Sequence, residues 1–225
     1  MIELSDVSYS YGGGELLTEI DLTLGPGSFH FLTGPSGAGK TTFLKLCYAD
    51  LLATTGRVAA FGQDAREMDR DDIARLRRRI GVVHQDCRFL DHLPVAENVA
   101  LPLTVSGRDA SAEADNLLDL LGWVGLSEQT GALPPQLSGG ERQRAALARA
   151  VIMDPEIVIA DEPTGNIDWD MSLRLLTLLV ELNRMGKTIL VATHDLNLIR
   201  AAKQQVAARV RVVGNRGIQL AGRDL

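Results

Sequence analysis

Short runs of consecutive apolar residues alternate along this chain with longer stretches whose apolar residues recur at helical spacing. The short runs are β-prone and predict buried strands at 28–33, 80–84, 157–161 and 188–193. Helical spacing predicts helices at 42–48, 69–79, 95–103, 112–121, 140–153, 171–185 and 196–202. Buried strands that alternate with helices indicate an α/β fold, with a mostly parallel sheet covered on both faces.

The pattern is different toward the two ends of the chain. Apolar runs at 2–7 and 20–24 flank a turn sequence at 11–14, a tyrosine followed by three glycines. These runs predict an antiparallel β unit with a tight turn. A further strand is predicted at 57–61, and a terminal pair of strands over 206–213.

The middle of the chain, residues 86–153, is punctuated by turns and carries no buried-strand pattern. We therefore expect an inserted helical subdomain at about 86–153. The core would then comprise residues of about 1–85 and 154–225. Together with the subdomain, residues 1–225 would form one domain, since 225 residues is within the size range of a single domain.

Composition narrows the class of protein. The chain has 225 residues, a net charge of −6, and two cysteines, Cys47 and Cys87, that show no metal-binding spacing. No stretch approaches the ~20 apolar residues of a membrane span, and the first residues lack a signal-peptide pattern. We therefore expect a cytoplasmic protein with reduced thiols. The negative charge disfavours nucleic acid as a partner.

Basic residues gather in two segments despite the negative net charge. Residues 75–79 read Arg-Leu-Arg-Arg-Arg, and 196–223 carry basic residues, including Arg223, but no acid. Either segment suits a surface that faces anionic lipid or an acidic partner. The alternative is ordinary solvated charge.

Residues 34–41 read Gly-Pro-Ser-Gly-Ala-Gly-Lys-Thr and fit the phosphate-loop pattern G-x-x-x-x-G-K-[ST]. They lie between a predicted strand and a predicted helix, which is the context this motif needs. Glycines let backbone N–H groups point at phosphates, and the helix N-terminus adds positive potential. Lys40 would reach the β- and γ-phosphates, and the Thr41 hydroxyl would ligate Mg²⁺. The predicted phosphate-binding residues are Gly34, Pro35, Ser36, Gly37, Ala38, Gly39, Lys40, Thr41 and Thr42.

Two adjacent carboxylates, Asp161 and Glu162, follow the predicted strand at 157–161. Asp161 is placed to hold Mg²⁺ directly or through water. Glu162 is placed to polarise an attacking water as a general base. The alternative is a pair of surface acids, but a phosphate loop upstream favours the catalytic interpretation.

A second helix N-terminus follows the sequence Leu-Ser-Gly-Gly-Glu at 137–141. Ser138 and the paired glycines leave backbone donors exposed before the predicted helix, so this end also suits an anion. One nucleotide needs only one phosphate loop, which suggests that this end serves a nucleotide held by another subunit. Taken alone, these five residues are weak evidence, because Ser-Gly-Gly is a common turn.

The chain resembles the ATP-binding-cassette (ABC) ATPases over nearly its whole length. The phosphate loop, the signature at 137–141 and the paired carboxylates occur in the order of that family. Gln85 matches the Q-loop glutamine, and Tyr11 matches the aromatic residue that stacks on adenine. The D-loop matches 165–168, including Asn166 and Asp168, and the switch-histidine region matches 193–195, which contains His194.

The family pattern implies roles for these positions. Glu162, His194 and Gln85 would be the catalytic residues, with His194 at the γ-phosphate. ATP and Mg²⁺ would be the cofactors, with Thr41, Gln85 and Asp161 as metal ligands. Two copies would sandwich two ATP molecules head to tail. The residues that would face the partner's nucleotide are Ser138, Gly139, Gly140, Glu141 and Asp168.

The chain departs from the family pattern in a few places. His84 stands where the family usually has phenylalanine, and the C-terminal strands over 206–220 fit the family's usual ending loosely. Glu141 occupies the common glutamine position of the signature. These departures leave the ATPase interpretation unchanged.

Residues 137–144 and 162–168 resemble the branch that contains cell-division, lipoprotein-releasing and macrolide-exporting ATPases, and 85–103 are most similar to the cell-division members. That resemblance implies an integral membrane subunit and a place on the inner face of the bacterial membrane. The membrane subunit would dock in a groove lined by parts of 75–79 and 87–99.

Three alternatives are open at this point. The chain could be the motor of a lipoprotein or macrolide exporter. It could be a module in which ATP-driven dimerisation signals, although Glu162 together with His194 favours real turnover. A soluble ABC protein that acts on DNA or ribosomes is disfavoured, because such proteins usually carry two cassettes or long coiled-coil insertions.

Overall fold

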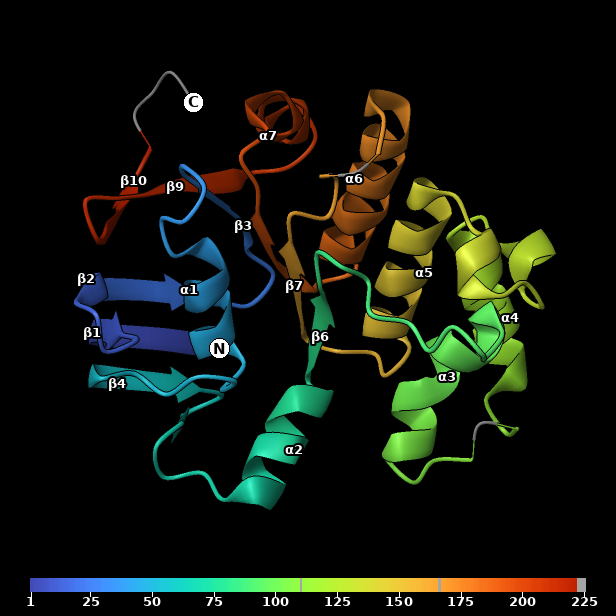
Figure 1. Cartoon of the computed structure of the whole chain (residues 1–225), viewed down its shortest axis with the longest axis horizontal. Helices are drawn as coiled ribbons and strands as arrows, with labels where there is room; N and C mark the ends of the chain where they lie inside the picture. Colours follow the sequence, from blue (N-terminus) through green and yellow to red (C-terminus); the bar gives the residue numbers. More distant parts are fainter. Residues whose placement is uncertain (110, 166, 222–225) are drawn as a thin grey trace.

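The computed structural model describes residues 1–109, 111–165 and 167–221, and it contains two β-sheets (Figure 1). The smaller sheet is antiparallel, with the strand order β2-β1-β4-β5. Ile2 at the start of β1 lies opposite Leu24 on one side and Ala60 on the other, and all three side chains are buried. The antiparallel unit predicted for the N-terminal region is therefore present. Its strands are β1 (Ile2–Ser10), β2 (Glu15–Leu24), β4 (Thr55–Ala60) and β5 (Gln63–Asp64).

The larger sheet has the strand order β10-β9-β3-β8-β7-β6. Its strands are parallel except for the edge strand β10, which pairs antiparallel with β9. Every residue of β3, β7 and β8 is buried, which explains why these strands read as continuous apolar runs. The strands are β3 (Phe29–Thr33), β6 (Ile80–Val83), β7 (Ile157–Asp161), β8 (Thr188–Ala192), β9 (Ala208–Gly214) and β10 (Gly217–Leu220).

The helices begin at side chains suited to capping. Asp69, Ser138, Asp168 and Asp195 each accept a hydrogen bond from a backbone N–H in the first turn of the helix that follows. In the part of the chain described here, no helix has the length and apolar character needed to cross a bilayer. The helices are α1 (Lys40–Cys47), α2 (Arg70–Arg78), α3 (Val95–Val105), α4 (Ala114–Trp123), α5 (Gly139–Val151), α6 (Trp169–Arg184) and α7 (Leu196–Lys203), with 3-10 turns at Ser127–Gln129 and Pro134–Gln136.

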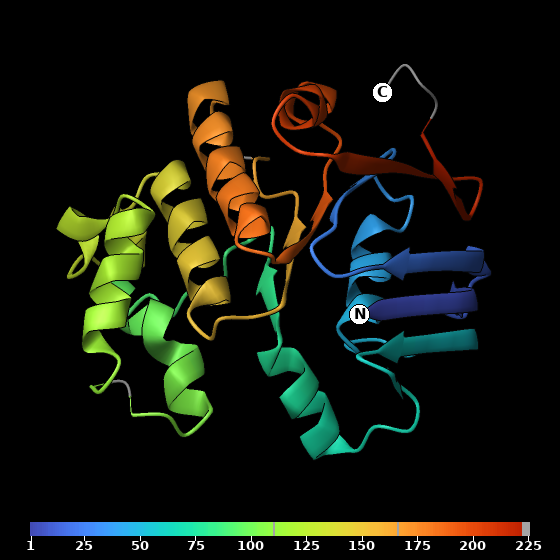
Figure 2. The same ribbon diagram turned by 180° about the vertical axis from the view of Figure 1, so that it is seen from behind.

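Two buried apolar clusters cover opposite faces of the larger sheet. Phe29 and Phe31 of β3 pack with side chains of α5, α6 and α7. Leu32, on the other face of the same strand, packs with α1 and with the smaller sheet. The two ribbon views show α1 between the sheets and α5 and α6 on the far side (Figures 1 and 2). The carboxyl ends of β3, β7 and β8 therefore meet at one edge, where parallel sheets bind their ligands.

The terminal strand pair differs from the sequence interpretation. A pair was expected within 206–213, but β9 alone fills most of that range and β10 follows after a turn. Asn215 and Arg216 form this turn with φ values of 49° and 65°, which suits a two-residue hairpin. An arginine at a positive φ is an uncommon turn residue, so the sequence pattern concealed the turn.

Candidate functional site

The phosphate loop joins β3 to α1 and depends on glycine at several positions. Gly34, Gly37 and Gly39 have φ values of 146°, 77° and 103°, which side chains disfavour. A Cβ atom on Gly34 would also lie 2.4 Å from the carbonyl oxygen of Val213. The backbone of residues 34–41 can therefore follow this path only with these glycines.

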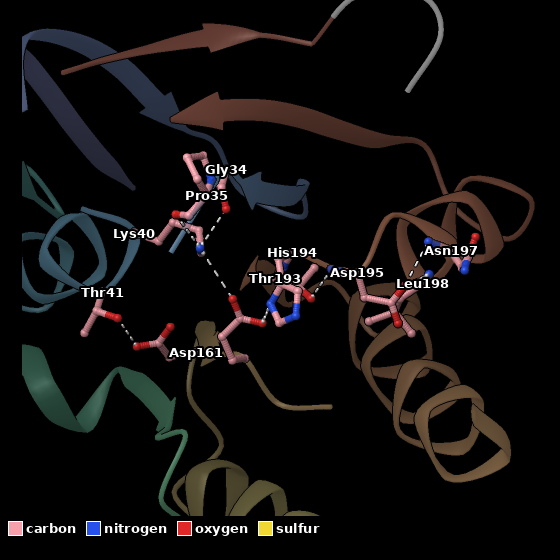
Figure 3. Close-up of polar contacts among 11 residues, drawn as sticks. Gly34, Pro35, Lys40, Thr41, Asp161, Thr193, His194, Asp195, Asn197 and Leu198 are labelled. Atoms are coloured by element: carbon pink, nitrogen blue, oxygen red, sulfur yellow. Dashed lines mark hydrogen bonds and ion pairs between the residues drawn. The ribbon is translucent and has the colours of Figure 1, made fainter. Parts of the chain in front are cut away.

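Lys40, the first residue of α1, folds back over the loop (Figure 3). Its Nζ donates to the carbonyl oxygens of Gly34 at 2.9 Å and Pro35 at 3.2 Å. The same ammonium lies 3.5 Å from Oε1 of Glu162, which follows β7. One buried cation thus links the phosphate loop after β3 to the carboxylate after β7, which is two strands away from β3 in the sheet.

A cavity of about 550 Å³ opens at this edge of the sheet. It contains most of the predicted phosphate-binding residues together with all the predicted catalytic and metal-binding residues. The side chains and backbone that line it belong to Leu16, Pro35, Ser36, Gly37, Gly39, Lys40, Thr41, Thr42, Gln85, Asp161, Glu162, Gly165 and His194.

Asp161 ends β7 and faces the start of α1. The Thr41 hydroxyl donates to its Oδ2 at 2.7 Å, while its Oδ1 is buried and has no hydrogen-bond partner within the described residues. Burial raises the pKa of Asp161, and the nearby charge of Glu162 adds to this, whereas the Thr41 hydrogen bond and Lys40 lower it. A hydroxyl beside a carboxylate with an unused oxygen fits a site for a hard cation such as Mg²⁺.

Glu162 is held in a strained conformation between two basic side chains. Its φ is 45°, in the left-handed region, and its N–H donates to the carbonyl of Ala192 in β8 at 2.8 Å. Its Oε2 lies 2.9 Å from Nδ1 of His194 and accepts a 3.4 Å hydrogen bond from the His194 N–H. His194 follows β8, so neighbouring parallel strands bring the two residues together.

Gln85 reaches the same cavity from the end of β6. It follows His84 in a turn, and it lines the cavity beside Asp161 and Glu162. After His194 the chain continues into α7, where the N-cap residue Asp195 accepts hydrogen bonds from the N–H groups of Asn197 and Leu198 (Figure 3). The site is thus assembled from the carboxyl ends of β3, β6, β7 and β8.

Tyr11 lies outside the cavity lining but next to the phosphate-loop helix. Its hydroxyl is 3.2 Å from Oγ1 of Thr42, and its ring meets the edge of Tyr9 at 4.8 Å. The side chain is 64% exposed. Stacking of adenine on this ring stays a prediction.

The signature residues lie on a different element and do not line this cavity. Ser138 and Glu141 form a capping box at the start of α5: the Ser138 N–H and hydroxyl both donate to Oε2 of Glu141, at 2.8 and 2.7 Å. These hydrogen bonds lower the pKa of Glu141. A carboxylate therefore performs the capping that the usual glutamine amide could also perform. Gly140 packs against Met171, where an added Cβ would lie 3.2 Å from Cγ of that residue.

Several other positions complete the account of the predicted residues. Gly34 and Ala38 shape the loop without lining the cavity, and Asp168 caps α6 through a 2.9 Å bond from the Met171 N–H. Leu16 of β2 lines the cavity and was missed, because nothing in an alternating strand pattern marks it. Asn166 and Arg223 lie outside the described residues.

A second cavity, also of about 550 Å³, lies where α2, β6, α3 and α5 meet. The expected groove residues are present only in part. Arg77, Arg78 and Arg88 line it, but Arg79 instead covers the ring of Phe61 at 3.5 Å and pairs with Glu156. The remaining lining residues are Ala74, Ile80, Gly81, Val82, His84, Pro102, Val105, Ser106, Arg149, Ala150 and Met153.

Comparisons with known proteins agree on one family. The family model described as ABC transporter matches residues 17–165. The cell division ATP-binding protein FtsE of Haemophilus influenzae is 45% identical over 205 residues, covering 89% of this chain and 93% of that protein. FtsE of Bacillus subtilis is 41% identical over 92% of each chain. FtsE of Escherichia coli K12 is 42% identical, covering 88% of this chain and 90% of that one.

Solved structures give the same answer for the fold. The dimeric post-hydrolysis ATP-binding cassette MJ0796, bound to ADP and Pi, superposes with a TM-score of 0.86 at 31% identity, covering 97% of both chains. A second dimeric structure of MJ0796, described as a bacterial ABC transporter cassette, gives a TM-score of 0.87 at 32% identity and the same coverage.

Proposed function

Because this chain belongs to the ABC transporter family and is an ATPase of that family, we propose that it is the ATP-hydrolysing subunit of a membrane-associated complex that acts in cell division. The observation that carries the ATPase activity is the meeting of Lys40, Asp161, Glu162 and His194 around one cavity. Similarity to FtsE over most of the chain supports the cell-division role.

Each cavity residue has a proposed task at the nucleotide. The loop and Lys40 hold the phosphates, Glu162 accepts the proton of the attacking water, and His194 fixes the orientation of that carboxylate. Thr41, Asp161 and Gln85 are the proposed Mg²⁺ ligands. The unpartnered Oδ1 of Asp161 supports this choice. Bound Mg²⁺ would neutralise charge on the phosphate oxygens.

The proposed assembly is a head-to-tail homodimer in which the Ser138 end of α5 meets the nucleotide of the other copy. Three observations support it: the capped N-terminus of α5 is exposed, it lies outside the chain's own cavity, and the similar cassettes were solved as dimers. Within each copy, we propose that residues of about 86–153 form a helical subdomain inserted into the core.

Ser138→Arg is expected to block ATP-dependent dimerisation while monomers still bind ATP. The added bulk and charge would enter the phosphate site of the partner. Sedimentation of the variant with ATP, in a Glu162→Gln background, measures the effect. Ser127→Arg is the matched control, since Ser127 is an exposed serine of the helical region. Normal dimerisation of a folded Ser138→Arg protein contradicts the head-to-tail arrangement.

The proposed partner is an integral membrane protein of the FtsX type, and the proposed location is the inner face of the bacterial membrane. The exporter alternatives are less favoured, because the similar proteins are named for cell division. Depletion of this chain in its own host separates the possibilities: filamentous or lysing cells support the cell-division role, whereas mislocalised lipoproteins or macrolide sensitivity would replace it with export.

The cavity between α2 and α5 is the proposed docking groove for that membrane subunit. Its lining combines the cationic side chains of Arg78 and Arg88 with apolar ones such as Val105 and Met153, which suits an amphipathic segment carrying acidic residues. Arg77 is less available, because it donates to the carbonyl of Ala49 at 2.9 Å.

Replacing Arg78 and Arg88 together by glutamate is expected to weaken co-purification with the FtsX-type subunit by roughly tenfold, because attraction becomes repulsion. ATP hydrolysis by the isolated protein should persist. Arg75→Glu is the control: Arg75 lies on the same helix but pairs with Asp72 outside the groove. A folded double variant that still co-purifies fully would rule out this docking surface.

A further inference from the structure

The turn that carries Gln85 has a strained backbone. The Cys87 N–H donates to the carbonyl of His84 at 3.1 Å, and the Arg88 N–H donates to that of Asp86 at 2.6 Å. Cys87 and Arg88 have φ values of 54° and 27°, in a region that residues other than glycine seldom occupy. Two such residues in succession persist only where surrounding contacts hold them.

One side chain of α5 supplies those contacts. Arg149 donates through Nη2 to the carbonyl of Cys87 at 2.6 Å and through Nη1 to that of Arg88 at 2.8 Å. Its guanidinium also covers the ring of Phe89 at 4.6 Å. A single arginine thus contacts three successive residues, and both strained residues are bonded through their carbonyls.

Arg149 is an unusual choice for a structural contact. No carboxylate pairs with it among the described residues, and burial lowers the pKa of its guanidinium, which nonetheless stays charged. Arg149 is only half-buried, but even a partly buried charge without a counter-ion is costly, and an apolar side chain of similar volume would often be no less stable. The fork geometry of the guanidinium, which matches two carbonyls at once, points to a requirement for this turn geometry.

Fixed segments flank the turn on both sides. On one side, β6 is paired within the larger sheet. On the other, the buried side chain of Asn98 accepts from the Leu90 N–H at 2.8 Å and donates to the carbonyls of Leu90 and Leu93 at 3.0 and 2.8 Å. Between these anchors, Arg149 holds the second half of the turn, and Gln85 extends from the first half into the nucleotide cavity.

We propose that Arg149 is a positioning residue that holds the turn after β6 in its strained form and thereby fixes Gln85 at the nucleotide. The part of this proposal that concerns Gln85 rests on the proposed ATPase site. Arg149 also lines the docking groove, and it lies on the helix capped by Ser138, about 16 Å further along. Arg149 is therefore part of the helix that Ser138 caps, lines the groove and contacts the turn.

Cys87 offers a direct reporter of this turn. Its thiol is 4% exposed and burial raises its pKa, so it should react slowly with a maleimide. The chain has two cysteines, so Cys47→Ala leaves Cys87 as the single reactive thiol. In that background, Arg149→Met removes the donors and Arg149→Lys keeps the charge without the fork. Arg142→Met is the control, because Arg142 covers the same ring at 5.7 Å but donates to Pro134 instead of the turn.

Labelling of Cys87 should accelerate by roughly tenfold or more in Arg149→Met, less in Arg149→Lys, and not in Arg142→Met. In the same proteins, kcat for ATP should fall with Arg149→Met while KM changes little, since the phosphate loop is intact. A cooperatively melting Arg149→Met protein that labels at the parent rate overturns the proposal, and so does fast labelling with full kcat. If Arg149→Met does not fold, Arg149→Lys is judged by the same criteria. Neither measurement involves the membrane subunit, so failure of the cell-division role would be seen separately, in recruitment.

Discussion

Replacing Glu162 by glutamine is expected to lower kcat for ATP hydrolysis by about 10²–10⁴-fold, which is the usual contribution of a positioned general base. The amide keeps the shape of the carboxylate but cannot accept a proton from water. ATP binding should be retained, because the phosphate loop and Lys40 are unchanged. Phosphate release by the purified protein measures the first effect, and calorimetric titration with ATP measures the second.

The geometry around Glu162 sharpens this expectation. One oxygen lies 2.9 Å from Nδ1 of His194 and the other 3.5 Å from Nζ of Lys40, so an amide retains only part of these contacts. With hydrolysis blocked, the ATP-bound dimer should accumulate in sedimentation. Glu156→Gln is the control, because Glu156 precedes β7 at the opposite end of that strand and pairs with Arg79. Phosphate release near the parent rate from Glu162→Gln would remove the general base from the proposed mechanism.

The parts of the fold that the sequence predicted well are those whose physics is local. Buried parallel strands must be apolar at every position, so β3, β7 and β8 could be recognised from composition alone. The phosphate loop was equally recognisable, because its path demands glycine at fixed spacing. Lys40, Asp161 and His194 could then be placed together, since parallel strands direct their carboxyl ends to one edge.

The parts that escaped prediction depend on which tertiary contacts the long side chains make. Arg79 belongs to a run of basic residues, yet it leaves the groove to stack on Phe61 and pair with Glu156. Arg149 looks like any polar residue of an amphipathic helix, and its contacts with the turn at Cys87 depend on how α5 packs. Helical spacing contains no information about such partners.

Replacing Lys40 by alanine is expected to weaken ATP binding by ~10–100-fold, corresponding to the ~1.5–3 kcal/mol of a hydrogen bond to a charged group. Lys40 brings the one ammonium that lines the cavity within the described chain. Its removal also leaves Glu162 without the cation now 3.5 Å away, so a negative charge would face the phosphates unopposed. Both changes act against ATP, and calorimetric titration with and without Mg²⁺ measures their sum.

The control must show that the loss of ATP affinity comes from removing Lys40 and would not follow from removing any lysine of low exposure. Lys187→Ala serves that purpose, because Lys187 is also shielded and pairs with Asp154, but it lies at the start of β8, away from the nucleotide edge. Lys187→Ala should lower the melting temperature modestly and leave ATP affinity at the parent value. Lys40→Ala should lower ATP affinity and leave the melting temperature at the parent value, since its hydrogen bonds to the loop carbonyls can be taken over by water at the cavity surface. A folded Lys40→Ala protein that binds ATP as tightly as the parent would show that the loop at 34–41 does not hold the phosphates, and the roles assigned to Asp161 and Glu162 would then lose their reference point.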